Sequence, residues 1–201
     1  HKIDIDDIEN AISKSRPDFI FHLASSIPTS SFLTSFNVNV MYSIKILEVL
    51  ERLKLDNFSK VLFVGSAAEY GIVDNKYLPI QETCLTDPFS PYGISKLTTS
   101  NLAINWQKNN RHITIARPFT VIGSNMPTHM ALGSFFNQIE KSYHKKLEVG
   151  NLETQRDFID VRDLVDIFYK LLNSKSTAGQ IYNVCSGRPV SIKEILSYYL
   201  K

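Results

Sequence analysis

The stretch Lys60-Val-Leu-Phe-Val-Gly-Ser66 decides the fold, because an uninterrupted apolar run ending in small residues is typical of a strand buried on both faces. Similar apolar runs occupy residues 18–24 and 113–117. Apolar residues at helical spacing fill 37–53, and Pro91 opens a second helix that extends to about residue 109. Because parallel strands need crossovers, this alternation predicts a doubly wound parallel α/β sheet.

The C-terminal part of the sequence is less regular. We expect helices at about 131–144 and 161–172, a strand at 180–184 and a terminal helix that begins near Ser191. There are no internal repeats, and residues 174–179 are the one stretch that reads as a connector.

Composition excludes several classes of protein. The 201 residues carry 22 Lys and Arg against 20 Asp and Glu, so the chain lacks the charge to follow a phosphate backbone, and no nucleic-acid partner is expected. The two cysteines, Cys84 and Cys185, form no ligand cluster, so we expect reduced thiols, no metal site and a cytoplasmic protein. No run approaches the roughly 18 apolar residues of a membrane span, and no membrane partner is expected.

The motif with a chemical meaning is Tyr92-Gly-Ile-Ser-Lys96, which places Tyr92 and Lys96 on one face of the expected helix. A phenol ordinarily ionises only near pH ~10, and a neighbouring ammonium favours the phenolate. Ser66 closes the strand before this helix, at the edge where open α/β sheets bind ligands. These three residues are therefore the candidate acid/base and substrate-orienting groups.

Ordered sequence blocks give a more specific indication. The blocks are His22-Leu-Ala24, Asn39-Val-Met-Tyr-Ser43, Gly65-Ser-Ala-Ala-Glu-Tyr-Gly71, Tyr92-Gly-Ile-Ser-Lys96, Arg117-Pro-Phe119, Arg156-Asp-Phe158 and Tyr182-Asn-Val-Cys-Ser-Gly187. In this order they resemble the extended short-chain dehydrogenase/reductases across essentially the whole chain. Within that family the chain is most similar to reductases of GDP-4-keto-6-deoxy-mannose.

The resemblance implies a Rossmann-like domain at residues 1–122, without its first strands, with 156–173 packing back on it. Residues 123–155 and 174–201 would form part of a smaller substrate-binding lobe. The family's glycine-rich turn and second strand would lie before His1, and the family continues beyond Lys201, so the sequence is expected to be truncated at both ends.

The resemblance also assigns roles to single residues. Catalytic residues would be Ser66, Tyr92 and Lys96, with Asn39 orienting Lys96. NAD or NADP would contact Asp4, Ile5, Leu23, Ala24, Tyr92, Lys96 and Phe119. A nucleotide-sugar would contact Ser26, Ser66, Ala67, Thr120, Asn151 and Arg156, with the arginine on its diphosphate. The family commonly forms homodimers, which would pair the helices at about 37–53 and 91–109 with their copies.

Three of these assignments, and the presence of His22 in its sequence block, have purely structural alternatives. Asp4 can be a helix cap, Arg156 a surface ion pair, Asn39 a residue that starts a helix, and His22 a packed histidine at the end of a strand. Two departures from the family pattern concern the substrate: Tyr42 replaces a glycine, and the loop that begins at Thr120 is not rich in asparagine and proline.

Three functions remain open at this point. The first is reduction of the 4-keto group of a nucleotide-linked 6-deoxy-hexose, and the second is 4-epimerisation by the same residues. Dehydration is disfavoured because Ala67 and Ala68 stand where dehydratases carry acidic residues. The third possibility, of another class, is a non-catalytic dinucleotide-binding or nucleotide-sugar-binding protein or an inactive fragment.

Overall fold

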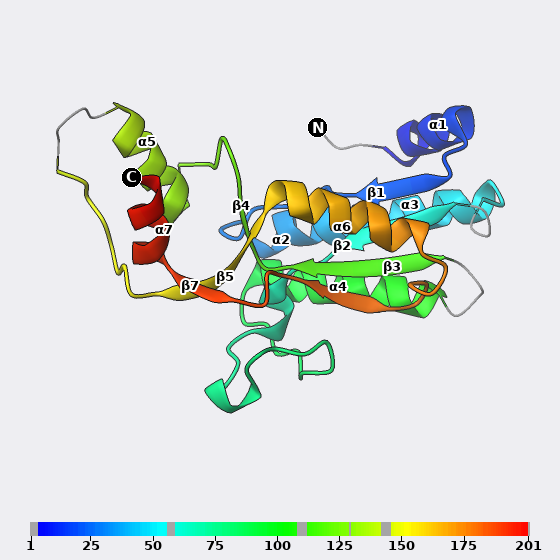
Figure 1. Cartoon of the computed structure of the whole chain (residues 1–201). Coiled ribbons are helices and arrows are strands. Elements are labelled where there is room, and N and C mark those ends of the chain that lie inside the picture. Colours follow the sequence, from blue (N-terminus) through cyan, green and yellow to red (C-terminus); the bar gives the residue numbers. More distant parts are fainter. Residues whose placement is uncertain (1–3, 56–58, 108–111, 129, 142–145, 201) are drawn as a thin grey trace. The chain divides into compact units, whose positions relative to one another are not determined.

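The computed structural model describes residues 4–55, 59–107, 112–128, 130–141 and 146–200. It divides into two compact units (Figure 1). The first comprises His1–Pro118 and Asp166–Val184, and the second comprises Phe119–Val165 and Cys185–Lys201.

The first unit is built on a four-stranded parallel sheet. Its strands, in spatial order, are β1 (Phe19–His22), β2 (Lys60–Val64), β3 (Ile113–Pro118) and β6 (Ile181–Val184). Five consecutive residues of β3 are buried, as expected for a strand covered on both faces. The parallel sheet predicted from the alternating apolar runs is therefore confirmed.

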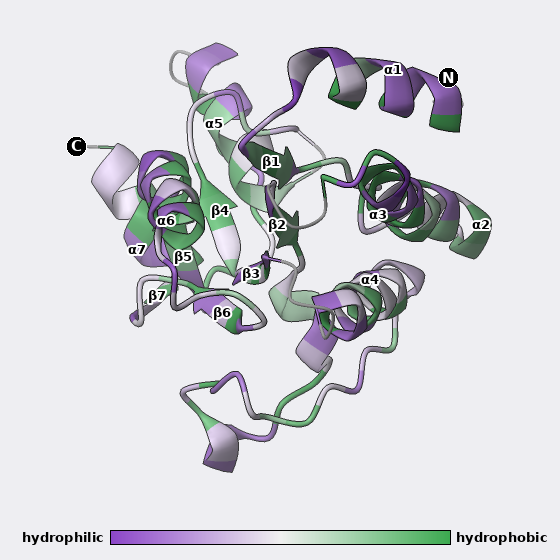
Figure 2. Ribbon diagram, turned by 90° about the vertical axis from the view of Figure 1, so that its right-hand side faces the viewer, coloured by the Kyte–Doolittle hydropathy of each residue, from purple (hydrophilic) through white to green (hydrophobic). Residues whose placement is uncertain are grey.

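Helices cover both faces of this sheet. Helices α3 (Tyr42–Arg52) and α4 (Pro91–Gln107) lie on one side, and α6 (Val161–Asn173), whose residues from Asp166 onward belong to this unit, lies on the other (Figure 2). Two short 3-10 helices, η2 (Ala67–Tyr70) and η3 (Asn75–Tyr77), follow β2. The core is made of apolar side chains from the strands and from the inner faces of α1, α3 and α4, namely Ile12, Leu47, Val49, Leu50, Val61, Phe63, Ala103, Ile113 and Ile115.

Helix α1 (Ile5–Ser15) was not foreseen, although its start carries a clear signal. Asp4 is its N-cap and accepts a hydrogen bond from the Ile5 N–H at 2.6 Å, while Asp7 completes a capping box. Ile5, Ile8 and Ile12 recur at helical spacing and pack toward the core. Asp4 therefore caps a helix, which was the structural alternative for this residue.

An irregular helix precedes α3. Helix α2 (Phe32–Ser35) passes into a π-helix, η1 (Phe36–Met41), which continues directly into α3. The backbone carbonyl of Asn39 in η1 accepts hydrogen bonds from the Ser43 hydroxyl at 2.6 Å and from the Thr99 hydroxyl at 3.0 Å. The extra residue in this turn is therefore stabilised by side chains of α3 and α4.

The second unit has its own sheet and apolar cluster. Strands β4 (Thr120–Ile122), β5 (Gln155–Asp160) and β7 (Pro189–Ser191) form the sheet, with β4 parallel and β7 antiparallel to β5. The helices are α5 (Ala131–Lys141) and α7 (Ile192–Tyr199), the latter capped by Ser191. They share a cluster made of Leu132, Phe135, Ile192 and Leu196.

The observed sheets differ from the expected division in two places. Strand β6, inside the segment 174–201 assigned to the lobe, pairs with β3 and belongs to the first unit. Strand β5, which apart from its first residue lies in the segment 156–173 expected to pack on the first domain, pairs with β4 and β7 in the second unit. The ends of the helices expected to reach 109 and 144 lie outside the described residues.

Candidate active site

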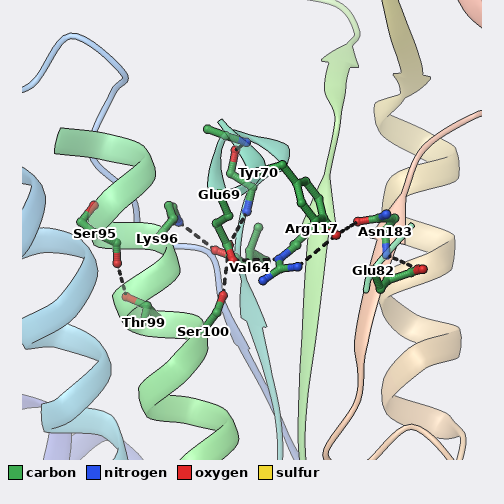
Figure 3. Close-up of polar contacts among 12 residues, drawn as sticks. Val64, Glu69, Tyr70, Glu82, Ser95, Lys96, Thr99, Ser100, Arg117 and Asn183 are labelled. Atoms are coloured by element: carbon green, nitrogen blue, oxygen red, sulfur yellow. Dashed lines mark hydrogen bonds and ion pairs between the residues drawn. The ribbon is translucent and has the colours of Figure 1, made fainter. Parts of the chain in front are cut away.

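The structure brings Tyr92, Lys96 and the end of β2 together. Both side chains come from the first turns of α4, and Lys96 Nζ lies 5.8 Å from the centroid of the Tyr92 ring. Lys96 Nζ also donates a hydrogen bond of 2.8 Å to the Val64 carbonyl, two residues before Ser66 (Figure 3). The motif predicted to carry the chemistry thus lies at the carboxyl edge of the sheet.

Ser66 is held in a defined orientation at this edge. It is the N-cap of η2, and its Oγ accepts a hydrogen bond of 3.1 Å from the Ala68 N–H. Because that bond uses a lone pair of the oxygen, the hydroxyl proton is left to be donated to another acceptor. Ser66 and the adjacent Ala67 are only half-buried, so a ligand can reach them.

Lys96 is a strongly perturbed titratable group near this edge. Its side chain is buried, with 3% of the residue exposed. Burial lowers the pKa of Lys96 to about 8, and the Glu69 carboxylate acts in the opposite direction by favouring the ammonium. Since this pKa lies above neutrality, Lys96 is mostly charged at pH ~7.

Asn39 supports the site through the residue next to Lys96. Its Nδ2 donates to Ser95 Oγ at 2.8 Å and to Ser26 Oγ at 3.1 Å, and its Oδ1 accepts from the Ser26 N–H at 2.9 Å. Asn39 thus contacts α4 at the residue before Lys96, and its expected role in orienting Lys96 stays a prediction. Ser26, predicted to bind substrate, is buried in this network.

His22 closes the same network from β1. Its Nε2 lies 3.0 Å from Ser43 Oγ, and its ring packs edge-on against Phe63 at 5.3 Å between centroids. Burial, with a smaller effect of the Lys96 charge, lowers the pKa of His22 to about 4. The contacts match the alternative of a packed histidine at the end of a strand.

Sequence reasoning missed the buried ion pair of Glu69 and Arg117. The Arg117 Nε donates to Glu69 Oε2 at 2.7 Å, and both side chains are almost completely buried (Figure 3). A charged residue in a turn carries no periodic pattern, and its partner lies 48 positions away. The available signal was the charge of Arg117 within a strand that is otherwise without charged residues.

The residues expected at the cofactor differ in exposure. Leu23 and Ala24 directly follow β1 and are exposed, with Leu23 59% exposed. Asp4 caps α1, and Ile5 packs against the core of the first unit. The contact of these four residues with a cofactor stays a prediction.

Four predicted residues lie in the second unit. Phe119, directly before β4, and Thr120, the first residue of β4, are both half-buried. The exposed Asn151 accepts a hydrogen bond from the Glu153 N–H at 3.0 Å, and the exposed Arg156 on β5 donates to the Gln155 carbonyl at 2.8 Å. Their roles toward a ligand stay predictions.

The described residues contain neither a metal-ligand cluster nor a helix that could span a membrane. Within these residues, no three His, Cys, Asp or Glu side chains are placed to hold a metal ion. Over the same ranges, none of the helices has the length and apolar character needed to cross a bilayer.

Curated proteins with similar sequences are named for reactions of nucleotide-sugars. The chain is 33% identical over 190 residues to GDP-6-deoxy-D-mannose reductase of Pseudomonas aeruginosa, covering 90% of this chain and 61% of that protein. It is 31% identical over 190 residues to GDP-6-deoxy-D-talose 4-dehydrogenase of Aggregatibacter actinomycetemcomitans, covering 94% and 63%. The chain thus spans about three fifths of the length of these relatives.

Solved structures show the same architecture. RMD from Pseudomonas aeruginosa complexed with NADPH superimposes with a TM-score of 0.89 and 28% identity, covering 96% of this chain and 66% of that one. UDP-glucuronic acid 4-epimerase from Bacillus cereus, in complex with UDP-glucuronic acid and NAD, gives a TM-score of 0.82 and 27% identity, covering 97% and 62%. The sequence pattern of the NAD dependent epimerase/dehydratase family matches residues 1–185. With its parallel sheet and its Tyr92 and Lys96 at the sheet edge, the chain belongs to the NAD dependent epimerase/dehydratase family.

Proposed function

We propose that this chain is part of a nucleotide-sugar oxidoreductase that reduces the 4-keto group of a GDP-linked 6-deoxy-hexose. The observation that carries the proposal is the position of Lys96, beside the Tyr92 ring and hydrogen-bonded at the end of β2 two residues before Ser66. The reductase and the 4-dehydrogenase among the relatives, both named for GDP-6-deoxy sugars, support the choice of substrate.

The chain's own residues would handle the proton. Tyr92 donates its hydroxyl proton to the sugar's keto oxygen, so that the O–H bond of the tyrosine breaks as the O–H bond of the alcohol forms. The Ser66 hydroxyl donates a hydrogen bond to the same oxygen, which is consistent with its lone pair already accepting from Ala68. The Lys96 ammonium stabilises the phenolate that Tyr92 becomes.

The residues present fit a bound nicotinamide dinucleotide, NAD or NADP. Lys96 has three N–H donors, of which one reaches Val64, so others can serve a ribose hydroxyl. The exposed Leu23 and Ala24 at the end of β1 offer an apolar surface to a ring. When bound, the cofactor supplies the hydride that reduction needs.

The nature of the substrate-contacting residues restricts the reaction. Ala67 and Ala68 cannot move a proton, so elimination of water from the sugar would lack its acid/base group at these positions. In the second unit, the exposed Arg156 is suited to a diphosphate because a guanidinium binds phosphate oxygens in a bidentate way. Of the other residues expected at the substrate, Ser26 and Ser66 belong to the first unit and Thr120 and Asn151 to the second.

A second candidate is 4-epimerisation, because a UDP-glucuronic acid 4-epimerase of known structure shares the fold. An epimerase keeps its cofactor and returns it to the starting redox state, whereas a reductase consumes NAD(P)H. The complete natural polypeptide should therefore be assayed for loss of reduced-nicotinamide absorbance with GDP-, UDP-, CDP- and dTDP-linked keto sugars. Sugar interconversion without net NAD(P)H consumption would move the assignment to the epimerase, and binding without turnover to a non-catalytic protein.

The decisive variant is Tyr92→Phe, which removes only the donor hydroxyl. We expect turnover to fall about 10²–10⁴-fold, the usual contribution of a general acid. Tyr77→Phe is the matched control, because Tyr77 is exposed on η3. The turnover of this variant should equal that of wild type. Equal turnover of Tyr92→Phe and wild type would refute the mechanism.

We further propose a cytoplasmic homodimer. Its interface would pair α3 and α4 with their copies about a two-fold axis, because a two-fold interface uses the same patch twice. Light scattering that gives the mass of a monomer at tens of micromolar would contradict it.

A further inference from the structure

Glu69 is a fully buried carboxylate directly beside the candidate active site. Its Oε1 accepts hydrogen bonds from the Ser66 N–H at 2.9 Å and from the Ser100 hydroxyl at 3.0 Å. Its Oε2 accepts from Arg117 Nε at 2.7 Å (Figure 3). One side chain from η2 therefore joins the end of β2 to both α4 and β3.

The surrounding residues keep this carboxylate in one place. Arg117 Nη1 donates to Tyr70 Oη at 3.0 Å, and Tyr70 donates to Asn183 Oδ1 on β6 at 2.7 Å. A Cβ added at Gly65 would collide with Glu69 Oε1, so the residue before Ser66 must lack a side chain. The position of the carboxylate is thus fixed from several directions.

The Glu69 carboxylate also interacts electrostatically with the Lys96 ammonium. The Glu69 carboxylate is bonded to Ser100, which lies one helical turn after Lys96 on the same face of α4. The side chains of Glu69 and Lys96 are both buried, so their interaction is weakly screened by solvent. Burial lowers the pKa of Lys96, and the Glu69 carboxylate opposes this by favouring the ammonium. The same group that fixes the Ser66 backbone thereby acts on the charge of the lysine.

We propose that Glu69 is a positioning residue of this active site, which holds the backbone of Ser66 at the end of β2 and keeps Lys96 in its charged form. The inference rests on the proposed roles of Ser66 and Lys96 in the reaction. Its two effects can nevertheless be measured on the protein without any turnover.

The first measurement follows the charge. The chain is labelled with ¹³C at lysine Cε, and the Lys96 resonance, assigned with Lys96→Met, is titrated with pH. In Glu69→Gln the Lys96 midpoint should fall by about one pH unit, because an opposite charge nearby has been removed. Glu82→Gln is the matched control: Glu82 is an exposed carboxylate that accepts from the Asn183 N–H, and its loss should leave the midpoint unchanged.

The second measurement follows the hydrogen bond. Glu69→Asp keeps a negative charge beside Arg117, so the buried arginine retains its partner and the fold is preserved. The shorter side chain withdraws the acceptor from the Ser66 N–H, so the Ser66 amide resonance should move upfield. The Lys96 midpoint should stay close to that of wild type.

The two variants make the inference refutable even where one of them folds poorly. It is overturned by a folded Glu69→Gln whose Lys96 midpoint equals that of wild type, or by a Glu69→Asp whose Ser66 amide does not move. Failure of the proposed function is a different result, in which both resonances behave as expected but the complete wild-type polypeptide turns over no keto sugar.

Discussion

Acidification from about pH 7 to about pH 5 should destabilise the protein through His22. Burial, assisted by the nearby Lys96 charge, lowers the pKa of His22 from 6.5 to about 4. The unfolded chain therefore binds a proton at this residue before the folded chain does. Stability must fall as the pH falls through the window from 6.5 to about 4, and must be fully regained above it.

The size of the effect follows from these two values. Near pH ~5 the unfolded histidine is almost fully protonated, whereas about a tenth of the folded population is. With about 1.4 kcal/mol per pH unit, the free energy of unfolding drops by about 2 kcal/mol between pH ~7 and pH ~5.

The assay is urea unfolding of wild type and of His22→Gln at both pH values. The variant loses its packing on Phe63 and should be less stable throughout, but it should lose about 2 kcal/mol less than wild type on acidification. His112, whose pKa is also lowered by burial, is present in both proteins and cancels in the comparison. Equal losses in the two proteins would refute the reasoning.

Two further predictions concern stability. Arg117→Leu should cost about 3–5 kcal/mol of unfolding free energy, because Glu69 is left buried without a counter-charge. Lys193→Ala, which breaks an exposed pair with Glu153, is the control and should cost less than about 1 kcal/mol. Similar urea midpoints for the two variants would contradict the prediction. Ser191→Ala should cost about 1 kcal/mol by removing the N-cap of α7, which circular dichroism during thermal unfolding can measure, and an unchanged midpoint would exclude that role.

Local patterns were enough to predict β2 and α4. The apolar run of β2 ends in small residues, and Pro91 marks the first helical residue of α4. The three-residue strands β4 and β7 were missed because so short a segment shows no periodicity, and they form only by pairing with β5.

The candidate site was predictable to a similar degree. Tyr92 and Lys96 share a helix, so their spacing alone places them together. Glu69 could not be identified, because its burial depends on Arg117, a partner from another strand that only the folded chain brings near. Contacts made across the fold leave little trace in local sequence patterns beyond single features such as the charge of Arg117 in β3.

The π-helix η1 has a consequence for comparing sequences. Its carbonyl at Asn39 is bound by Ser43 and Thr99, so its wider winding is part of how the helices meet. Removing one residue from Phe36–Met41 would restore regular winding and rotate α3 by about 100° relative to α2. Leu47 and Leu50 would then leave the core. If a related sequence is one residue shorter opposite this segment, its helix is wound differently there. The gap in the alignment should then stay within the helix and not be shifted to the nearest loop.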